Sequence, residues 1–110
     1  MTQSPNLDAL RWNNRVLLLF APKVTRQKQL LESHASALEE RNLKVFEITG
    51  VSEADEQLRG KFYIEAGAFA VVLIGRDGWK KLKRSEPINP NDIFRLIDSM
   101  PMRKEEMRRN

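Results

Sequence analysis

The sequence predicts one α/β domain with a four-stranded mixed sheet and helices on both faces. Two runs of the chain, residues 16–20 and 69–74, are continuously apolar, as expected of central strands that are covered on both faces. The patterns around them give the order β-α-β-α-β-β-α, in which a right-handed crossover makes the first two strands parallel. With 110 residues, of which 41% are apolar, the chain is long enough to enclose one core.

The first half of the chain predicts a βαβα unit. Pro22 ends the first strand, and the hydroxyl of Thr25 is suited to cap a helix that runs to about Arg41. Residues 43–48 indicate a second strand with apolar side chains on both faces. Ser52, followed three residues later by an acidic residue, resembles a capping box and predicts the start of a short second helix.

The second half predicts a β-hairpin followed by a helix. The dipeptide Asp77-Gly78 indicates a two-residue type I′ turn, in which both central residues have positive φ. The returning strand, residues 79–84, is rich in lysine, which is typical of an exposed sheet edge. Asn89 caps the last helix and Pro101 ends or kinks it. This helix buries an apolar stripe formed by Ile93, Leu96, Ile97 and Met100.

The two ends of the chain are expected to lie outside the packed domain. We place a flexible leader at residues 1–10, the domain at 11–101 and a charged tail, interpreted as a solvated helical extension, at 102–110. No apolar run approaches the roughly 18 residues that span a membrane, and the polar first residues lack the apolar region of a signal peptide. A cytoplasmic location is compatible with this, and so is a secreted or periplasmic one if a signal peptide has been removed.

Composition excludes several kinds of site. The chain has no cysteine, so disulfides, thiolate metal sites and thiol nucleophiles are impossible. His34 is the single histidine and lies on an apolar helix face, where a structural role is expected rather than a catalytic one. We therefore expect no metal and no cofactor. A formal charge of +4 permits contact with anions but is modest for a nucleic-acid binder.

Four stretches carry a resemblance to a known family: residues 11–22, 38–48, 71–78 and 96–109. The most specific piece is the Met-Pro-Met-Arg sequence of residues 100–103. The order of elements resembles the thioredoxin core. The closer likeness is to peroxiredoxin-like domains of unknown function, which occur in bacterial proteins and in vertebrate extracellular proteins such as sushi-repeat proteins and the coiled-coil-domain protein down-regulated by oncogenes. The resemblance covers nearly the whole chain and implies a thioredoxin-like fold, with no assigned activity.

Departures from the working enzymes are clear. Peroxiredoxins carry Pro-x-x-x-Thr-x-x-Cys after the first strand, whereas Pro22, Thr25 and Lys28 form a motif one residue shorter, with an amine in place of the thiol. Thioredoxins have a cis-proline before the third core strand, and the matching residue here is Ala70. Neither thiol–disulfide exchange nor thiol peroxidase chemistry is therefore available.

The loop after the first strand is the candidate site. A helix begins there, and the N–H groups of a helix N-terminus together with nearby cations favour an anion such as phosphate or carboxylate. The other interpretation is a solvated basic turn without a ligand. The predicted ligand-binding residues are Pro22, Lys23, Thr25, Arg26, Lys28 and Ala70.

The favoured function is a non-catalytic binding or protein-interaction module for an unknown protein partner or a small anionic ligand. An enzyme with non-thiol chemistry at the same loop is the alternative, and a catalytic Lys28 would need a lowered pKa. A third interpretation is weak nucleic-acid binding by the hairpin of residues 76–84, where Trp79 and lysines share a face. We interpret that hairpin instead as a protected edge with Trp79 covering the core, which argues against nucleic acid.

Overall fold

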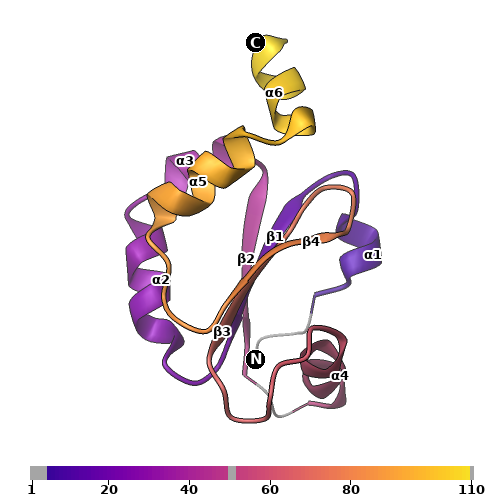
Figure 1. Ribbon diagram of the computed structural model, residues 1–110, viewed down its shortest axis with the longest axis vertical. Helices are drawn as coiled ribbons and strands as arrows, with labels where there is room; N and C mark the ends of the chain where they lie inside the picture. Colours follow the sequence, from indigo (N-terminus) through magenta and orange to yellow (C-terminus); the bar gives the residue numbers. More distant parts are fainter. Residues whose placement is uncertain (1–4, 50–51, 110) are drawn as a thin grey trace.

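The computed structural model describes residues 5–49 and 52–109. Its sheet has the order β2-β1-β3-β4 and is formed by β1 (Arg15–Phe20), β2 (Leu43–Ile48), β3 (Ala70–Ile74) and β4 (Lys80–Arg84). β1 is parallel to β2 and antiparallel to β3, which is antiparallel to β4. The predicted mixed sheet, with the two apolar strands at its centre, is confirmed (Figure 1).

Helices cover both faces of this sheet (Figure 1). One face is covered by α2 (Val24–Glu32), α3 (Ala35–Glu40) and α5 (Pro90–Asp98), and the other by α1 (Leu7–Leu10) and α4 (Glu53–Lys61). Successive side chains of a strand point to opposite faces. Leu17 and Leu19 of β1 therefore join the core cluster under α2 and α5, whereas Leu18 and Phe20 join the cluster under α4.

The predicted cap of the first long helix is wrong. α2 begins at Val24, and its N-cap is Lys23, which adopts a left-handed conformation and makes no side-chain cap hydrogen bond. Thr25 therefore lies within the first turn. In contrast, the predicted caps at Ser52 and Asn89 are confirmed, because each side chain accepts a hydrogen bond from a backbone N–H in the first turn of its helix.

The helix expected to run to about Arg41 is broken into α2 and α3. The hydroxyl of Ser33 donates to the carbonyl of Leu30, and the backbone N–H of His34 donates to Leu31 in place of Leu30. A serine hydroxyl that competes for a helical carbonyl favours such an interruption. The half-buried His34 ring lies edge-on to Phe94, with 5.7 Å between ring centroids, in agreement with its expected structural role.

The hairpin has a longer turn than predicted. Gly78 has a φ of 86°, whereas Asp77 is not among the positive-φ residues, so the turn is not type I′. Gly75 donates its N–H to the carbonyl of Trp79, which leaves a three-residue loop ending in a left-handed glycine. The Asp77 carboxylate accepts from the N–H of Trp79 and from Lys81. Trp79 does not cover the core, because it lies before an edge strand and is 72% exposed.

Both ends of the described chain make more contacts than expected. Leu7 and Leu10 of α1 pack against the core, although this segment is predicted as a flexible leader. Residues 1–4 of that leader, and residue 110, lie outside the described residues. The expected extension is helical and forms α6 (Pro101–Arg108). It is largely exposed, as predicted, but two of its side chains, Arg103 and Glu106, attach it to the domain.

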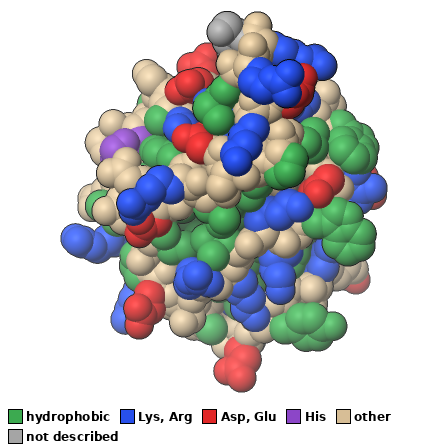
Figure 2. Space-filling model, turned by 45° about the horizontal axis from the view of Figure 1, so that its top comes forward, with side chains coloured by type: hydrophobic (Ala, Val, Ile, Leu, Met, Phe, Trp, Pro, Cys, Tyr) green, Lys and Arg blue, Asp and Glu red, His purple; other side chains and the backbone are tan. Residues whose placement is uncertain are grey.

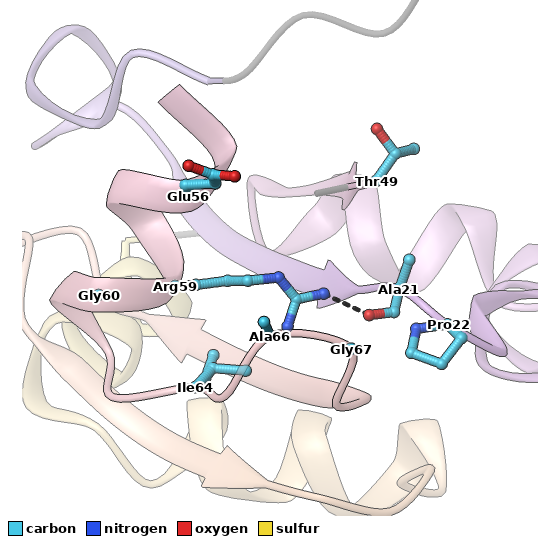
Figure 3. A pocket seen from close by; sticks show the side chains of 9 residues that line it. All are labelled: Ala21, Pro22, Thr49, Glu56, Arg59, Gly60, Ile64, Ala66 and Gly67. Carbon is cyan, nitrogen blue, oxygen red and sulfur yellow. Dashed lines mark hydrogen bonds between the residues drawn. The ribbon is translucent and has the colours of Figure 1, made fainter. Parts of the chain in front are cut away.

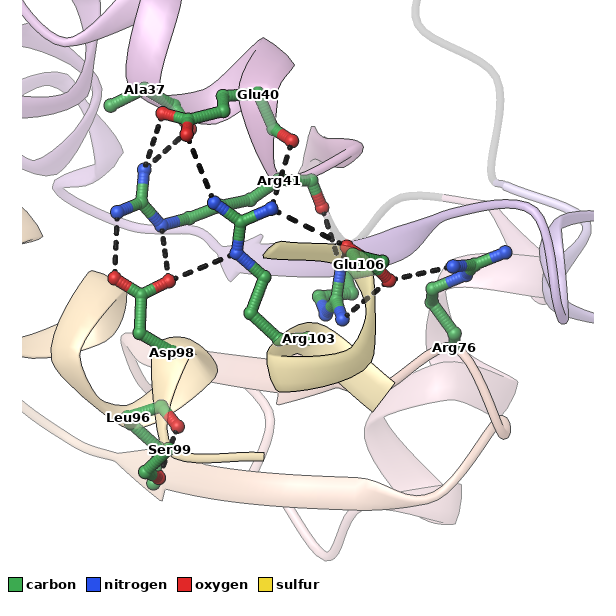
Figure 4. Close-up of polar contacts among 10 residues, drawn as sticks. Ala37, Glu40, Arg41, Arg76, Leu96, Asp98, Ser99, Arg103 and Glu106 are labelled. Carbon is green, nitrogen blue, oxygen red and sulfur yellow. Dashed lines mark hydrogen bonds and ion pairs between the residues drawn. The ribbon is translucent and has the colours of Figure 1, made fainter. Parts of the chain in front are cut away.

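Glu106 joins α6 to two strands (Figure 4). Its carboxylate lies 3.0 Å from the guanidinium of Arg15 on β1 and 2.6 Å from that of Arg76, which follows β3. Arg15 is only 1% exposed. A buried cation needs a close counter-charge, and Glu106 provides it.

Asp98 extends the same network to α3 (Figure 4). Its carboxylate accepts from Arg41 at 2.8 Å and from Arg103 at 3.1 Å. The buried Arg103 also reaches Glu40, at 3.1 Å. The network therefore connects α3, α5 and α6 through ion pairs.

Two carboxyl groups of this network make stability depend on pH. Burial raises the pKa of Asp98, but hydrogen bonds from two arginines outweigh it and hold the pKa below its ordinary value of 3.8. Burial also raises the pKa of Glu106, and hydrogen bonds from Arg15 and Arg76 hold it below 4.5. Because both folded-state pKa values are lowered, their stabilisation is complete above the unfolded-state values and is lost as pH falls through the folded-state values.

We therefore expect the free energy of unfolding to fall as the pH is lowered from about 5 to about 2. Asp98→Asn should make this dependence shallower, because an amide does not titrate in that range. Urea-unfolding midpoints at a series of pH values measure this pH dependence of stability. Glu105→Gln, on the exposed side of α6, should retain the wild-type slope. A wild-type slope in Asp98→Asn as well would show that Asp98 does not contribute to the pH dependence.

Candidate functional site

A cavity of about 560 Å³ lies at the end of the first strand (Figure 3). Ala21 and Pro22 follow β1, and Thr49 follows β2, so the cavity opens at the carboxyl ends of the two parallel strands. Ligands of open α/β sheets commonly bind at this end. The remaining wall comes from α4 and the loop after it, through Glu56, Arg59, Gly60, Ile64, Ala66 and Gly67.

Arg59 is the central side chain of this wall. It is 7% exposed, and its guanidinium donates to the carbonyl oxygens of Glu65 at 2.9 Å and Ala68 at 3.0 Å. It also donates to the carbonyl of Ala21 across the cavity (Figure 3). Below it, the ring centroid of Phe20 lies 5.4 Å from its Cζ atom. Arg59 thus ties α4 and its following loop to the end of β1.

Arg59 makes no ion pair within the described part of the chain. The three hydrogen bonds above all use carbonyl oxygens. Carbonyl dipoles stabilise a buried cation but carry no net negative charge. The arrangement suits an anion, since a guanidinium binds carboxylate or phosphate through paired N–H groups.

The residues predicted from sequence lie in several places. Pro22 lines the cavity, and a cis peptide bond joins it to Ala21. Lys23, Thr25 and Arg26 are exposed at the start of α2 and are not among the lining residues. Ala70 begins β3 opposite Phe20 and is 3% exposed, so its side chain belongs to the core.

Lys28 lies outside the cavity and has a carboxylate partner. Its ammonium is 2.9 Å from the carboxylate of Glu47 on β2. The hydrogen bond from Lys28 to Glu47, and then the negative charge of Glu47, raise the pKa of Lys28 above its ordinary value. A lysine that acts as nucleophile or base needs the opposite shift, so the structure argues against the catalytic role considered for Lys28.

Arg59 is the residue that sequence reasoning missed. It lies 38 positions after Ala21, and nothing local connects the two. The sequence offers only a weak signal: Arg59 lies in the predicted second helix, between Leu58 and a glycine. Only the packing of α4 against the end of β1 brings its guanidinium to the predicted site.

Within residues 5–49 and 52–109, no group of three or more His, Cys, Asp or Glu side chains is arranged to hold a metal ion. Over the same ranges, no helix has the length and apolar character needed to cross a membrane.

Comparison with solved structures supports the fold. The chain is similar to the reduced 2-Cys peroxiredoxin of Plasmodium vivax, with a TM-score of 0.70 and 16% identity over 92% of this chain and 85% of that one. It is also similar to thioredoxin peroxidase I of Plasmodium yoelii, with a TM-score of 0.72 and 15% identity over 90% and 79% of the two chains. At this identity the similarity shows a thioredoxin-like fold and nothing about activity.

Sequence relatives point to the family expected from the sequence. The chain is 27% identical to the sushi repeat-containing protein SRPX of Rattus norvegicus, over 96% of this chain and 27% of that protein. It is 24% identical to SRPX2 of Bos taurus, over 92% and 26% of the two chains. The chain thus spans about a quarter of the length of these relatives. Because the family model described as a domain of unknown function, DUF4174, matches residues 6–106, the chain belongs to the DUF4174 family.

Proposed function

We propose that this chain is a non-catalytic binding module whose cavity beside Pro22 receives an anionic group of a small ligand or a protein partner. The observation that carries the proposal is Arg59, a buried cation on the cavity wall that makes no ion pair with the described carboxylates. An anion entering the cavity would pair with this guanidinium.

The absence of cysteine supports a role without thiol chemistry. The solved relatives are a 2-Cys peroxiredoxin and a thioredoxin peroxidase, and a thiol peroxidase needs a cysteine thiolate. This chain contains no cysteine. The carboxyl groups with lowered pKa, Asp77, Asp98 and Glu106, are structural partners of lysine or arginine and lie outside the cavity.

The size and lining of the cavity limit the kinds of ligand that could bind in it. A volume of about 560 Å³ is within the range of small-molecule sites. Ile64, Ala66 and the ring of Pro22 offer apolar surface, whereas Thr49 and Glu56 offer oxygen atoms. A carboxylate or phosphate attached to a small apolar group fits these walls. A second negative charge close to Glu56 would be repelled.

We expect inorganic phosphate and acetate to shift the amide resonances of Thr49, Gly60 and Gly67 in an NMR titration. Arg59→Met removes the charge while filling similar space, and should weaken binding at least about tenfold, because hydrogen bonds to charged groups contribute about 1.5–3 kcal/mol. Arg59→Lys keeps the charge but loses the paired N–H geometry, and should bind with intermediate affinity.

Two exposed cations of the adjacent helix provide the matched controls. Lys23→Ala and Arg26→Ala each remove a positive charge near the loop without touching the cavity wall, and should leave affinity nearly unchanged. If these variants weaken binding while Arg59→Met does not, the anion binds at the start of α2 and the cavity proposal is wrong. Circular dichroism and the unfolding midpoint of each variant establish that it is folded before titration.

A further inference from the structure

Exposed aromatic side chains surround a second hollow, on the side of the molecule that carries α1 and α4. Tyr63 is 85% exposed and Trp79 is 72% exposed, and both line a depression of about 380 Å³. Figure 2 shows large hydrophobic side chains standing out beside lysines and arginines on the right of the molecule, where Figure 1 draws α1 and α4. Exposed aromatics grouped in this way mark an interaction surface.

The same depression is basic. Arg11, Lys61 and Lys80 line it with the two aromatics, and Lys83 approaches it by donating to the carbonyl of Tyr63 at 2.9 Å. Among the described residues, Lys61, Lys80 and Lys83 make no ion pair with a carboxylate, and the lining carboxylate, Asp77, is paired with Lys81. Arg11 is paired with Asp8, so the surface combines flat apolar rings with three lysines that make no ion pair with the described carboxylates.

The backbone at Tyr63 has a conformation that is unusual for a bulky residue. Tyr63 follows the cap of α4 and has a φ of 57°, a left-handed conformation for which glycine is the usual residue at a helix end. A bulky side chain there is strained. Because the ring is almost fully exposed, core packing does not compensate for the strain.

We propose that this aromatic–basic surface binds single-stranded nucleic acid. Each nucleotide of a single strand offers both groups that the surface can recognise, a planar base for Tyr63 and Trp79 and a phosphate for the lysines. An acidic peptide would satisfy the lysines but offers few planar groups, and a duplex keeps its bases stacked inside. The sequence argues against nucleic acid partly because Trp79 is predicted to cover the core, and its exposure removes that one reason.

The first experiment follows tryptophan fluorescence during titration with a deoxythymidine oligomer of about eight nucleotides, within the site sizes of single-strand binders. Trp12→Phe provides the background, because the chain has two tryptophans and only Trp79 lines the depression. We expect quenching of Trp79 and an affinity that falls roughly twentyfold when salt rises from about 50 to about 200 mM, as for neutralisation of about three phosphates.

Two aromatic variants test stacking. Trp79→Ala should weaken binding about tenfold. Fluorescence anisotropy of a labelled oligomer measures the affinity. Tyr63→Gly should weaken it similarly, and it should fold well because glycine adopts the left-handed conformation freely. Lys83→Ala should reduce the salt dependence, whereas Arg108→Ala, an exposed cation on α6, should leave both affinity and salt dependence unchanged.

Three outcomes would overturn the proposal. The first is absence of binding at low salt. The second is binding that Arg108→Ala weakens as much as Lys83→Ala does, which would indicate general attraction by net charge. The third is heparin or an acidic peptide that binds tighter than the oligomer without dependence on Tyr63 or Trp79. Arg59→Met should not alter oligomer binding, so this test is independent of the cavity.

Discussion

Replacement of Glu106 by alanine is expected to destabilise the protein by about 3 kcal/mol or more, because it leaves a buried arginine without its counter-charge. Glu106 is the carboxylate that pairs with Arg15 among the described residues, and Arg15 is 1% exposed. It also pairs with Arg76 and Arg103. Since native domains are stable by only about 5–15 kcal/mol, the loss is a large fraction of the total. Urea unfolding measures it.

The neighbouring Glu105 is the matched control. It lies on the same helix and pairs with Arg108 and Arg109, but its side chain is 48% exposed. Exposed ion pairs contribute about 0–1 kcal/mol, so Glu105→Ala should change the free energy of unfolding little. Amide exchange in α6 should accelerate in Glu106→Ala and not in the control. Equal losses in the two variants would show that Arg15 does not depend on Glu106.

The sheet could be predicted because its central strands leave little choice. A run such as Val-Leu-Leu-Leu-Phe at residues 16–20 cannot be exposed on either face, so it must lie in the middle of a covered sheet. The predictions that are wrong concern places where nearby polar groups compete for hydrogen bonds. Ser33 takes a helical carbonyl and breaks the first long helix, and Asp77 bonds to Trp79 and Lys81 in a longer turn. Such choices are decided by geometry that a residue pattern does not contain.

The candidate site could be predicted in part. The end of β1 was identified from the chain order, and Pro22 does line the cavity there. Arg59 was not identified, because the bond from its guanidinium to Ala21 is a tertiary contact between residues 38 positions apart. The exposure of Trp79 was missed for a related reason. An aromatic residue next to an edge strand can face the core or the solvent, and Trp79, which follows the unpredicted three-residue loop, faces the solvent.

The hydrogen bonds of Arg59 also help the cavity to keep its shape. Arg59 donates to three backbone carbonyls that belong to the end of β1 and to the loop before β3. The carbonyl of Glu65 also accepts from the backbone N–H of Ala68, so Arg59 adds to the hydrogen bonds that already fix this turn. The same guanidinium that we propose as an anion ligand therefore also holds the walls of the site in place.

Phe20→Ala should produce the second large effect, and it should act on stability and on the cavity together. Phe20 is fully buried at the end of β1, and Arg59 rests over its ring, 5.4 Å from the centroid. Truncation of a buried phenylalanine lowers the free energy of unfolding by about 3–5 kcal/mol. It also removes the ring that packs against the guanidinium of Arg59. We expect a lower urea midpoint and, in the folded variant, weaker binding of phosphate than in the wild type.

Leu19→Ala separates the two effects, because Leu19 is equally buried but points to the opposite face of the same strand. It should cost about 2–5 kcal/mol and leave phosphate affinity unchanged. Both variants are titrated with phosphate by NMR at low temperature and without urea, where each is folded. If Leu19→Ala weakens phosphate binding as much as Phe20→Ala does, loss of affinity follows general destabilisation, and the ring under Arg59 has no particular part in shaping the site.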